Sequence, residues 1–109
     1  MEQNELYPIF LKLHNLNVLI VGGGNVGLEK LSFLLKSSPN ANVEVVSKDF
    51  HLEIKVLAEK HPSITLTQSK FKKRMLKKRH MVIACTDDLE VNKKVYDLAR
   101  KRYLIWNKG

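Results

Sequence analysis

Apolar residues along the chain change their period from one block to the next. Short stretches rich in valine, isoleucine and leucine predict β-strands, several of them bounded by glycine, proline, serine or asparagine. Longer blocks between them carry apolar residues three and four positions apart, which is the spacing of an amphipathic helix. The pattern predicts strands over residues 17–21, 43–46, 63–67, 81–85 and 103–106.

Helices are expected between these strands. The first spans residues 25–38 and ends in the Ser-Ser-Pro-Asn loop at 37–40. The second carries apolar residues at 50, 54, 57 and 58 and is ended by His61-Pro62. The third begins at Asp87, because an Asp cap with Glu90 three residues later satisfies free backbone N–H groups. The basic residues 70–80 are expected to form one short helix or an irregular crossover.

Strands that alternate with helices predict βαβ units, and therefore a parallel sheet. Right-handed crossovers would place the strands in the order 3-2-1-4-5. We therefore expect an α/β fold of the Rossmann-like type, a doubly wound parallel sheet of about five strands with helices on both faces.

Four of the chain's five glycines lie in Gly22-Gly23-Gly24-Asn25-Val26-Gly27, between the first strand and the first helix. The stretch fits G-x-G-x-x-G, in which Gly22 permits the tight turn, Gly24 lets the backbone approach a pyrophosphate, and Gly27 lets the helix pack against the strand. Free N–H groups at the helix start then bind the phosphates. The glycines predict a dinucleotide site, with a turn that binds nothing as the weaker alternative. We expect residues 1–109 to form a single NAD(P)-binding domain.

The acidic residue that usually follows about 20 positions later, at the end of the second strand, is missing. That position holds Ser47, and Lys48 follows it. A carboxylate there hydrogen-bonds the adenine ribose and repels a 2′-phosphate, whereas Ser47 and Lys48 do neither strongly. Asp49 is near, with a cap on the next helix as its alternative role. We expect NAD as the cofactor, but these residues leave NADP open.

Composition limits the class of protein. Hydrophobic residues make up 44% of the chain, a globular composition, and no apolar run approaches the roughly 18 residues that cross a bilayer. The polar first residues do not suit a signal peptide, and the single Cys85 excludes an internal disulfide. We therefore expect a cytoplasmic protein with no membrane partner, and Cys85 as a small core residue. The formal charge of +8 favours an anionic partner.

Three stretches carry a family resemblance: YPIFLKLHNLNVLIVGGGNVGLEK (residues 7–30), VEVVSKDF (43–50) and MVIACTDDLEVNKKV (81–95). The Pro-Ile-Phe-Leu lead-in before the glycines is distinctive, and so is Thr-Asp-Asp followed by Val-Asn. Together, and in this order, they resemble the N-terminal module of siroheme synthase, the precorrin-2 dehydrogenase/sirohydrochlorin ferrochelatase family. The resemblance covers most of residues 7–107.

The resemblance implies an NAD-dependent oxidation of precorrin-2 to sirohydrochlorin, with hydride passing to the nicotinamide, in siroheme (porphyrin) biosynthesis. Many members then insert ferrous iron as a ferrochelatase, a lyase activity, and a homodimer is implied. By position, nucleotide contacts fall on Asn25 and Val26 and on Lys48 and Asp49. Thr86 and Asp87 end the fourth strand, at the sheet edge where ligands bind. The substrate is an anionic tetrapyrrole, which a basic protein would attract.

The chain departs from the family at its end. Members continue as Asn-Val-x-Asp into a dimerisation region, and that Asp is implied in both reactions. Asn107 matches the Asn, but the Asp would fall one residue beyond Gly109. We expect the chain to be the nucleotide-binding part, inactive alone, and nominate no catalytic residue. The four histidines lack ligand spacing and the family's iron goes to the substrate's pyrroles, so no protein-bound metal is expected.

Two other functions stay open. Seven of the ten residues from Lys70 to Arg79 are lysine or arginine, with Phe71 and Met75 among them, which suits nucleic-acid phosphates. No helix-turn-helix signature, zinc pattern or aromatic-rich sheet face accompanies them, so nucleic acid is the less favoured partner. A non-catalytic dinucleotide sensor that regulates a partner is the other alternative.

Overall fold

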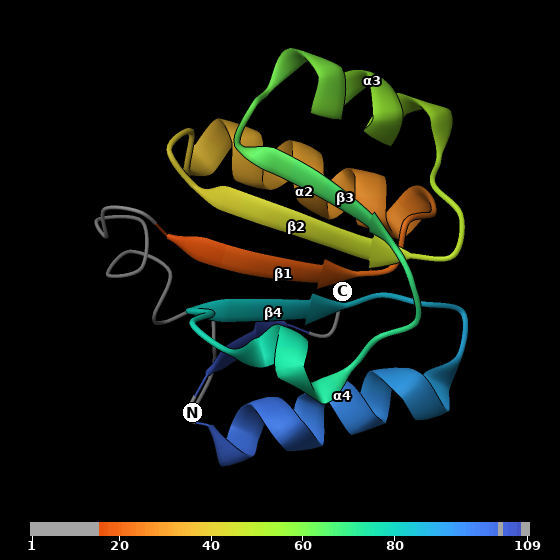
Figure 1. The fold of residues 1–109 in the computed structure, drawn as a ribbon, viewed down its shortest axis with the longest axis vertical. Coiled ribbons are helices and arrows are strands. Elements are labelled where there is room, and N and C mark those ends of the chain that lie inside the picture. Colours follow the sequence, from red (N-terminus) through yellow and green to blue (C-terminus); the bar gives the residue numbers. More distant parts are fainter. Residues whose placement is uncertain (1–15, 103, 108–109) are drawn as a thin grey trace.

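The computed structural model describes residues 16–102 and 104–107, which form one parallel sheet flanked by helices (Figure 1). In chain order the elements are β1 (Asn17–Val21), α2 (Asn25–Ser37), β2 (Asn42–Ser47), α3 (Leu52–Lys60), β3 (Ile64–Gln68), the 3₁₀ turn η2 (Lys73–Leu76), β4 (Met81–Ala84), α4 (Leu89–Lys101) and β5 (Ile105–Asn107). The lead-in at residues 8–11 and Tyr103, the predicted start of the last strand, lie outside the described residues. No helix in the described ranges is long and apolar enough to cross a membrane.

The strands lie in the order β3-β2-β1-β4-β5, and every pair of neighbours is parallel. The predicted fold class and strand order are confirmed. β1 and β4 are neighbours in the sheet although two strands separate them in the sequence, so the winding of the sheet reverses between them. In open α/β sheets, ligands bind outside the carboxyl ends of the strands at such a reversal.

Successive residues of the central strands supply two separate cores. On β1, Val18 and Ile20 belong to the core under α2 and α3, whereas Leu19 and Val21 belong to the core under α4 and η2. Figure 1 shows α2 behind the strands and α4 at the bottom of the view, below β4. A strand covered on both faces needs apolar side chains at consecutive positions, which explains the unbroken Val-Leu-Ile-Val run.

Helix starts depend on side chains that cap them, and these shift two predicted boundaries. α3 begins at Leu52 because the Nδ1 of His51 accepts a hydrogen bond from the N–H of Glu53 at 3.0 Å. α4 begins at Leu89 because the carboxylate of Asp88 accepts from the Glu90 N–H at 2.9 Å. The predicted cap on α4, Asp87, is therefore wrong by one residue.

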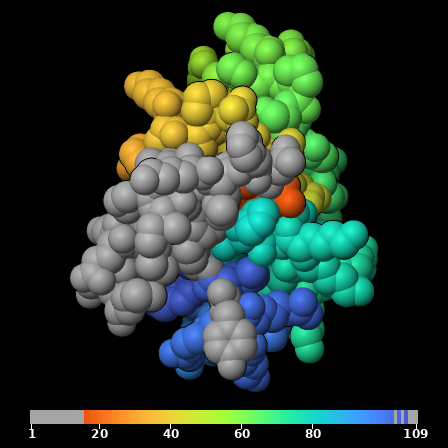
Figure 2. All heavy atoms as spheres, turned by 90° about the vertical axis from the view of Figure 1, so that its left-hand side faces the viewer, coloured from red at the N-terminus to blue at the C-terminus, as the bar shows by residue number. Residues whose placement is uncertain are grey.

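The basic segment, residues 70–80, combines both predicted forms, since η2 is a single turn within an irregular crossover. Six of its lysine and arginine side chains are exposed: Lys70, Lys72, Lys73, Arg74, Lys77 and Lys78. Figure 2 shows the region around η2 (teal) as a ridge on one side of the molecule, between α3 and β3 (green) and α4 (blue).

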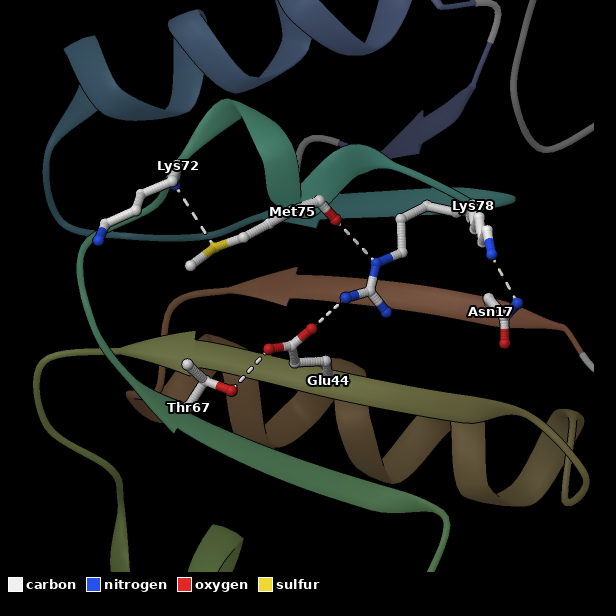
Figure 3. A network of polar contacts seen from close by, with 7 residues as sticks. Asn17, Glu44, Thr67, Lys72, Met75 and Lys78 are labelled. Carbon is white, nitrogen blue, oxygen red and sulfur yellow. Dashed lines mark hydrogen bonds and ion pairs between the residues drawn. The ribbon is translucent and has the colours of Figure 1, made fainter.

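Arg79 ties the basic segment to the sheet through a network whose other members, Glu44, Thr67 and Met75, are labelled in Figure 3. Its guanidinium pairs with the carboxylate of Glu44 on β2, and its Nε donates to the Met75 carbonyl at 2.9 Å. The other oxygen of Glu44 accepts from the hydroxyl of Thr67 on β3 at 2.6 Å. The Arg79 and Glu44 side chains are only 17% and 22% exposed, so removing one would leave a poorly solvated charge unpaired.

Candidate functional site

An open cavity of about 1160 Å³ lies at the carboxyl ends of the strands, beside the reversal between β1 and β4. Loops after β1, β2 and β4 line it, and the end of β3 adds one side. It brings together eight of the nine predicted nucleotide-contact residues, namely Gly22, Gly24, Asn25, Val26, Lys48, Asp49, Thr86 and Asp87. The ninth, Gly27, is buried against the turn and acts through packing.

Three of the four clustered glycines are required by the packing of the protein itself. A Cβ on Gly22 would lie 2.7 Å from the carbonyl oxygen of Cys85, and the φ of +128° at Gly22 strains any other residue. A Cβ on Gly23 would lie 2.5 Å from the carbonyl oxygen of Asp49. A Cβ on Gly27 would clash with the carbonyl oxygen of Gly22. The glycine turn therefore fits tightly between the loops that follow β2 and β4.

Gly24 differs from the other three. A Cβ there would meet no atom of the described structure within 4 Å, and its φ of −93° is open to any residue. Gly24 is exposed and lines the cavity. Since neither contacts nor conformation within the described residues require glycine here, the missing side chain leaves room in the cavity.

The helices that begin at this edge have different N-termini. His51 and Asp88 cap α3 and α4, and each of those helices has a glutamate in its first turn. In α2, by contrast, Gly24 makes no capping side-chain bond and the first turn holds no acidic residue. The backbone bond from Leu28 N–H to the Gly24 carbonyl, at 2.9 Å, begins the helix, so the N–H groups of residues 25–27 have no partner in it. Such a helix end presents N–H groups and a positive dipole, which suit a phosphate.

Asn92 on α4 fixes the loop after β4. Its Oδ1 accepts hydrogen bonds from the N–H and the hydroxyl of Thr86 at 3.0 and 2.6 Å, and its Nδ2 donates to the Thr86 carbonyl at 3.0 Å. Asn92 is 8% exposed, so these bonds satisfy a buried amide. Thr86 lines the cavity with its polar groups already engaged, whereas the next residue, Asp87, is exposed.

Sequence reasoning gave Asn92 no role of its own, although Val-Asn was noted within the resemblance. The signal was an asparagine among the apolar positions of a predicted helix, one turn after its start. A polar side chain on a buried helix face needs a partner, and the nearest one is the loop that leads into the helix.

The loop after β2 is held through the main chain. The His51 N–H donates to the Gly23 carbonyl at 2.7 Å, and the Gln68 amide donates to the Lys48 carbonyl at 2.9 Å. The Lys48 and Asp49 side chains are exposed, and within the described ranges neither makes a hydrogen bond or ion pair. Asp49 does not cap α3, so that alternative is wrong, and its carboxylate remains available to the cavity.

Two titratable side chains near the cavity stay neutral around pH 7. Burial raises the pKa of the Cys85 thiol to about 11, although Lys30 opposes the shift. Burial also raises the pKa of Tyr96 to about 12, and its hydroxyl donates to the Ala84 carbonyl at 2.6 Å. Neither group is a base at neutral pH. Among the described residues, no three histidine, cysteine or carboxylate side chains gather where they could hold a metal ion.

Known proteins resemble this chain over nearly its whole length. Residues 9–108 match the NAD_binding_7 family, described as "Putative NAD(P)-binding". Siroheme synthase of Pseudoalteromonas translucida is 40% identical over 100 residues, which are 92% of this chain and 20% of that protein. Siroheme synthase of Nitrosococcus oceani is 35% identical over 100 residues, 92% of this chain and 21% of that protein. The chain thus spans about a fifth of the length of these relatives.

A solved structure named SirC, precorrin-2 dehydrogenase, has a TM-score of 0.68 and 26% identity, over 77% of this chain and 41% of that one. The resemblance to the N-terminal module of siroheme synthase is therefore confirmed. The matched region contains the glycine turn and the loops after β2 and β4 that line the cavity. Since the family match extends over residues 9–108, the chain belongs to the NAD_binding_7 family.

Proposed function

We propose that this chain binds NAD in the cavity beside Gly24, as the cofactor-binding part of a precorrin-2 dehydrogenase. The observation that carries the proposal is the N-terminus of α2, whose free N–H groups lack a side-chain cap and lie beside a glycine that the protein's own packing does not require. Membership of the NAD_binding_7 family supports a nicotinamide dinucleotide, and the SirC neighbour supports the dehydrogenase.

The glycine turn would hold the pyrophosphate. The backbone of Gly24 leaves it room, and the N–H groups of Asn25 and Val26 donate to its oxygens. Gly22 and Gly27 contribute by closing the turn against β4 and the start of α2. When bound, the dinucleotide supplies the hydride acceptor.

The loops on either side would bind the riboses. The free carboxylate of Asp49 accepts hydrogen bonds from hydroxyls of the adenine ribose, beside the end of β2. Asp87 does the same from the loop after β4. Thr86, whose N–H and carbonyl are held by Asn92, forms a fixed wall of the cavity.

This chain spans about a fifth of the length of its relatives, so the activity of the complete protein is a proposal. We propose that the complete protein oxidises an anionic tetrapyrrole, precorrin-2, and that the exposed lysines of the basic segment attract its carboxylates. Three further points stay predictions: the insertion of iron with ferrous iron as substrate, a homodimer, and a single domain over residues 1–109. We also propose the cytoplasm as the compartment, because the single cysteine, Cys85, is a free thiol.

The basic segment fits a nucleic-acid interface less well than its composition suggested. Phe71 and Met75 pack against the core under α4, which leaves them unsuited to base stacking. Arg79 is engaged by Glu44. The non-catalytic sensor stays an open prediction, because it requires the same bound nucleotide.

Calorimetric titration of NAD into the chain and into the Gly24→Val variant tests the proposal. The valine side chain would occupy the space of the pyrophosphate, so binding should fall below detection while the variant still folds. A matched control, Asn40→Val, adds the same side chain to an exposed turn after α2 and should leave affinity unchanged. A folded Gly24→Val variant with the affinity of the parent chain would contradict the site.

A further inference from the structure

The end of β3 contributes to the cavity, and the nucleotide motif does not account for it. Ser69 and Lys70, which follow β3, line the same cavity as Ser47 and Lys48, which end and follow β2. The two strand ends are joined by a bond from Ser69 N–H to the Ser47 carbonyl at 3.1 Å. The Gln68 amide also donates to the Lys48 carbonyl at 2.9 Å. The two lysines therefore extend from adjacent backbones that are fixed relative to each other.

Both ammonium groups are available to a ligand. Lys48 and Lys70 are exposed, and among the described residues neither side chain takes part in an ion pair or hydrogen bond. The ion pair with Glu44 is made by Arg79, which lies at the other end of the basic segment from Lys70. Two free cations beside one cavity wall favour an anion there.

The residue that would exclude an additional phosphate is missing from the strand end. β2 ends at Ser47, where an NAD-specific site carries a carboxylate on the adenine ribose. The Ser47 side chain is packed beside the glycine turn, since a Cβ on Gly23 would lie 2.9 Å from its Cβ. The adenine ribose of a bound dinucleotide would therefore meet a hydroxyl at this point, with the lysines beyond it.

We infer that the adenosine end of this site accepts a 2′-phosphate between Lys48 and Lys70, so that the chain binds NADP as well as NAD. The inference rests on the proposed dinucleotide site. A phosphate monoester carries up to two negative charges and forms charge-assisted hydrogen bonds with ammonium groups. The Ser47 hydroxyl supplies a further donor at the same strand ends, whereas the Ser69 hydroxyl already donates to the Lys70 carbonyl at 2.8 Å.

Asp49 opposes this attraction, because its carboxylate lines the same cavity. It lies two residues beyond the strand end, in the exposed loop that leads to His51. At the β2 and β3 strand ends, two cations against one anion leave a net positive charge, so the lysines should outweigh it. Asp87, Asp88 and Lys94 line the cavity from the β4 side. Replacing Asp49 with asparagine should shift the balance further toward NADP.

Equilibrium titrations of NAD and NADP against the chain and three variants test the inference. The parent chain should bind the two nucleotides within about tenfold of each other. Lys48→Met and Lys70→Met should each weaken NADP about five- to tenfold more than they weaken NAD. Lys94→Met is the matched control, because Lys94 lines the cavity from α4, away from the β2 and β3 strand ends. That variant should leave the ratio of the two affinities unchanged.

The outcomes separate this inference from the proposed function. NAD binding with NADP at least about a hundredfold weaker would overturn the 2′-phosphate site and leave the dinucleotide site standing. An unchanged affinity ratio in both lysine variants would overturn it as well. Failure of both nucleotides to bind would overturn the proposed function, and the inference with it. A ratio that changes only in Lys48→Met and Lys70→Met, and more steeply at low salt, would support the inference.

Discussion

The loops after β2 and β4 lie on either side of the same glycine turn, but they are held in opposite ways. Beyond β4, Asn92 binds the N–H, the hydroxyl and the carbonyl of Thr86, and Asp88 caps the next helix. Beyond β2, main-chain groups do most of this work, as in the bond from the His51 N–H to the Gly23 carbonyl. The loop after β4 uses the side chains of Thr86 and Asp88 for its own structure and leaves Asp87 exposed, whereas the loop after β2 leaves both Lys48 and Asp49 without a side-chain partner among the described residues.

This difference assigns different tasks to the two sides of the cavity. A loop in which the side chains of Thr86 and Asp88 are engaged offers a fixed surface, which suits the positioning of a reacting group. A loop whose charged side chains are free can distinguish ligands by charge, because those side chains make their first strong contacts with the ligand. Selectivity between cofactors should therefore depend on the β2 side, and rigidity of the site on the β4 side.

The largest expected effect comes from forcing the glycine turn away from the β4 side. In Gly22→Ala, the new Cβ would lie 2.7 Å from the Cys85 carbonyl oxygen, at a φ of +128°. We expect the free energy of unfolding to fall by about 3 kcal/mol or more. Gly24→Ala, whose Cβ has open space, should cost about 1 kcal/mol through the weaker helix cap. Urea denaturation measures both, and equal losses would contradict the packing described for Gly22.

The next effect comes from releasing Thr86. Asn92→Leu removes three hydrogen bonds and leaves the Thr86 N–H and carbonyl without a side-chain partner, which should cost about 2–3 kcal/mol of stability. NAD affinity should fall with it, because the loop loses its fixed position. Thr86→Val is the control, since it keeps both bonds from Asn92 to the Thr86 backbone and loses only the bonds of the hydroxyl to Asn92 and to the Asp88 backbone, and it should cost about 1 kcal/mol. The comparison fails if the valine variant loses as much stability and affinity as the leucine variant.

A smaller effect is expected on the β2 side, where one side chain caps α3. His51→Ala removes the bond between Nδ1 and the Glu53 N–H and should lower the free energy of unfolding by about 0.5–1 kcal/mol. Because the Gly23 carbonyl is bound by the His51 backbone, NAD affinity should stay within about twofold. His61→Ala, at the other end of α3, serves as the control and should change neither quantity. A tenfold loss of affinity in His51→Ala would show that this side chain does more than cap a helix.

The sequence predicted the fold because its signals are local. The Val-Leu-Ile-Val run of β1 and the glycines after it act within a few residues, and the strand order then follows from right-handed crossovers. The glycines of the turn were predicted from the same local signal, whereas the resemblance implied the contacts of Asn25, Val26, Lys48 and Asp49; all of them follow a strand. They gather because parallel strands end at one edge of the sheet.

What the sequence did not reveal depends on contacts between distant residues or on a choice between adjacent caps. Glu44 and Arg79 are 35 residues apart, and no local pattern pairs them. Histidine is not among the favoured N-cap residues, so His51 gave no capping signal beside Asp49. Asp87 and Asp88 are chemically equivalent, and only the backbone geometry decides which one caps α4. Among the four glycines of the turn, Gly24 is the one that packing does not require, and this could be recognised only from the positions of the neighbouring atoms.

The smallest effect at neutral pH concerns Cys85, a half-buried titratable group on the β4 side. Because burial raises its pKa from 9.0 to about 11, the thiol should stay protonated and react slowly with iodoacetamide at pH 8 in the folded chain, and faster in urea. The raised pKa means that the folded state favours the neutral thiol, so this contribution to stability is complete below pH 9 and declines as the pH rises from 9 to 11. Cys85→Ala should therefore flatten the alkaline loss of stability without changing stability at pH 7 through ionisation. Lys30→Met removes the cation that opposes the shift and should slow alkylation further. Equal alkylation rates in the folded and unfolded chain would contradict the burial that raises the pKa of Cys85, and with it the view that the β4 side is the more closed of the two.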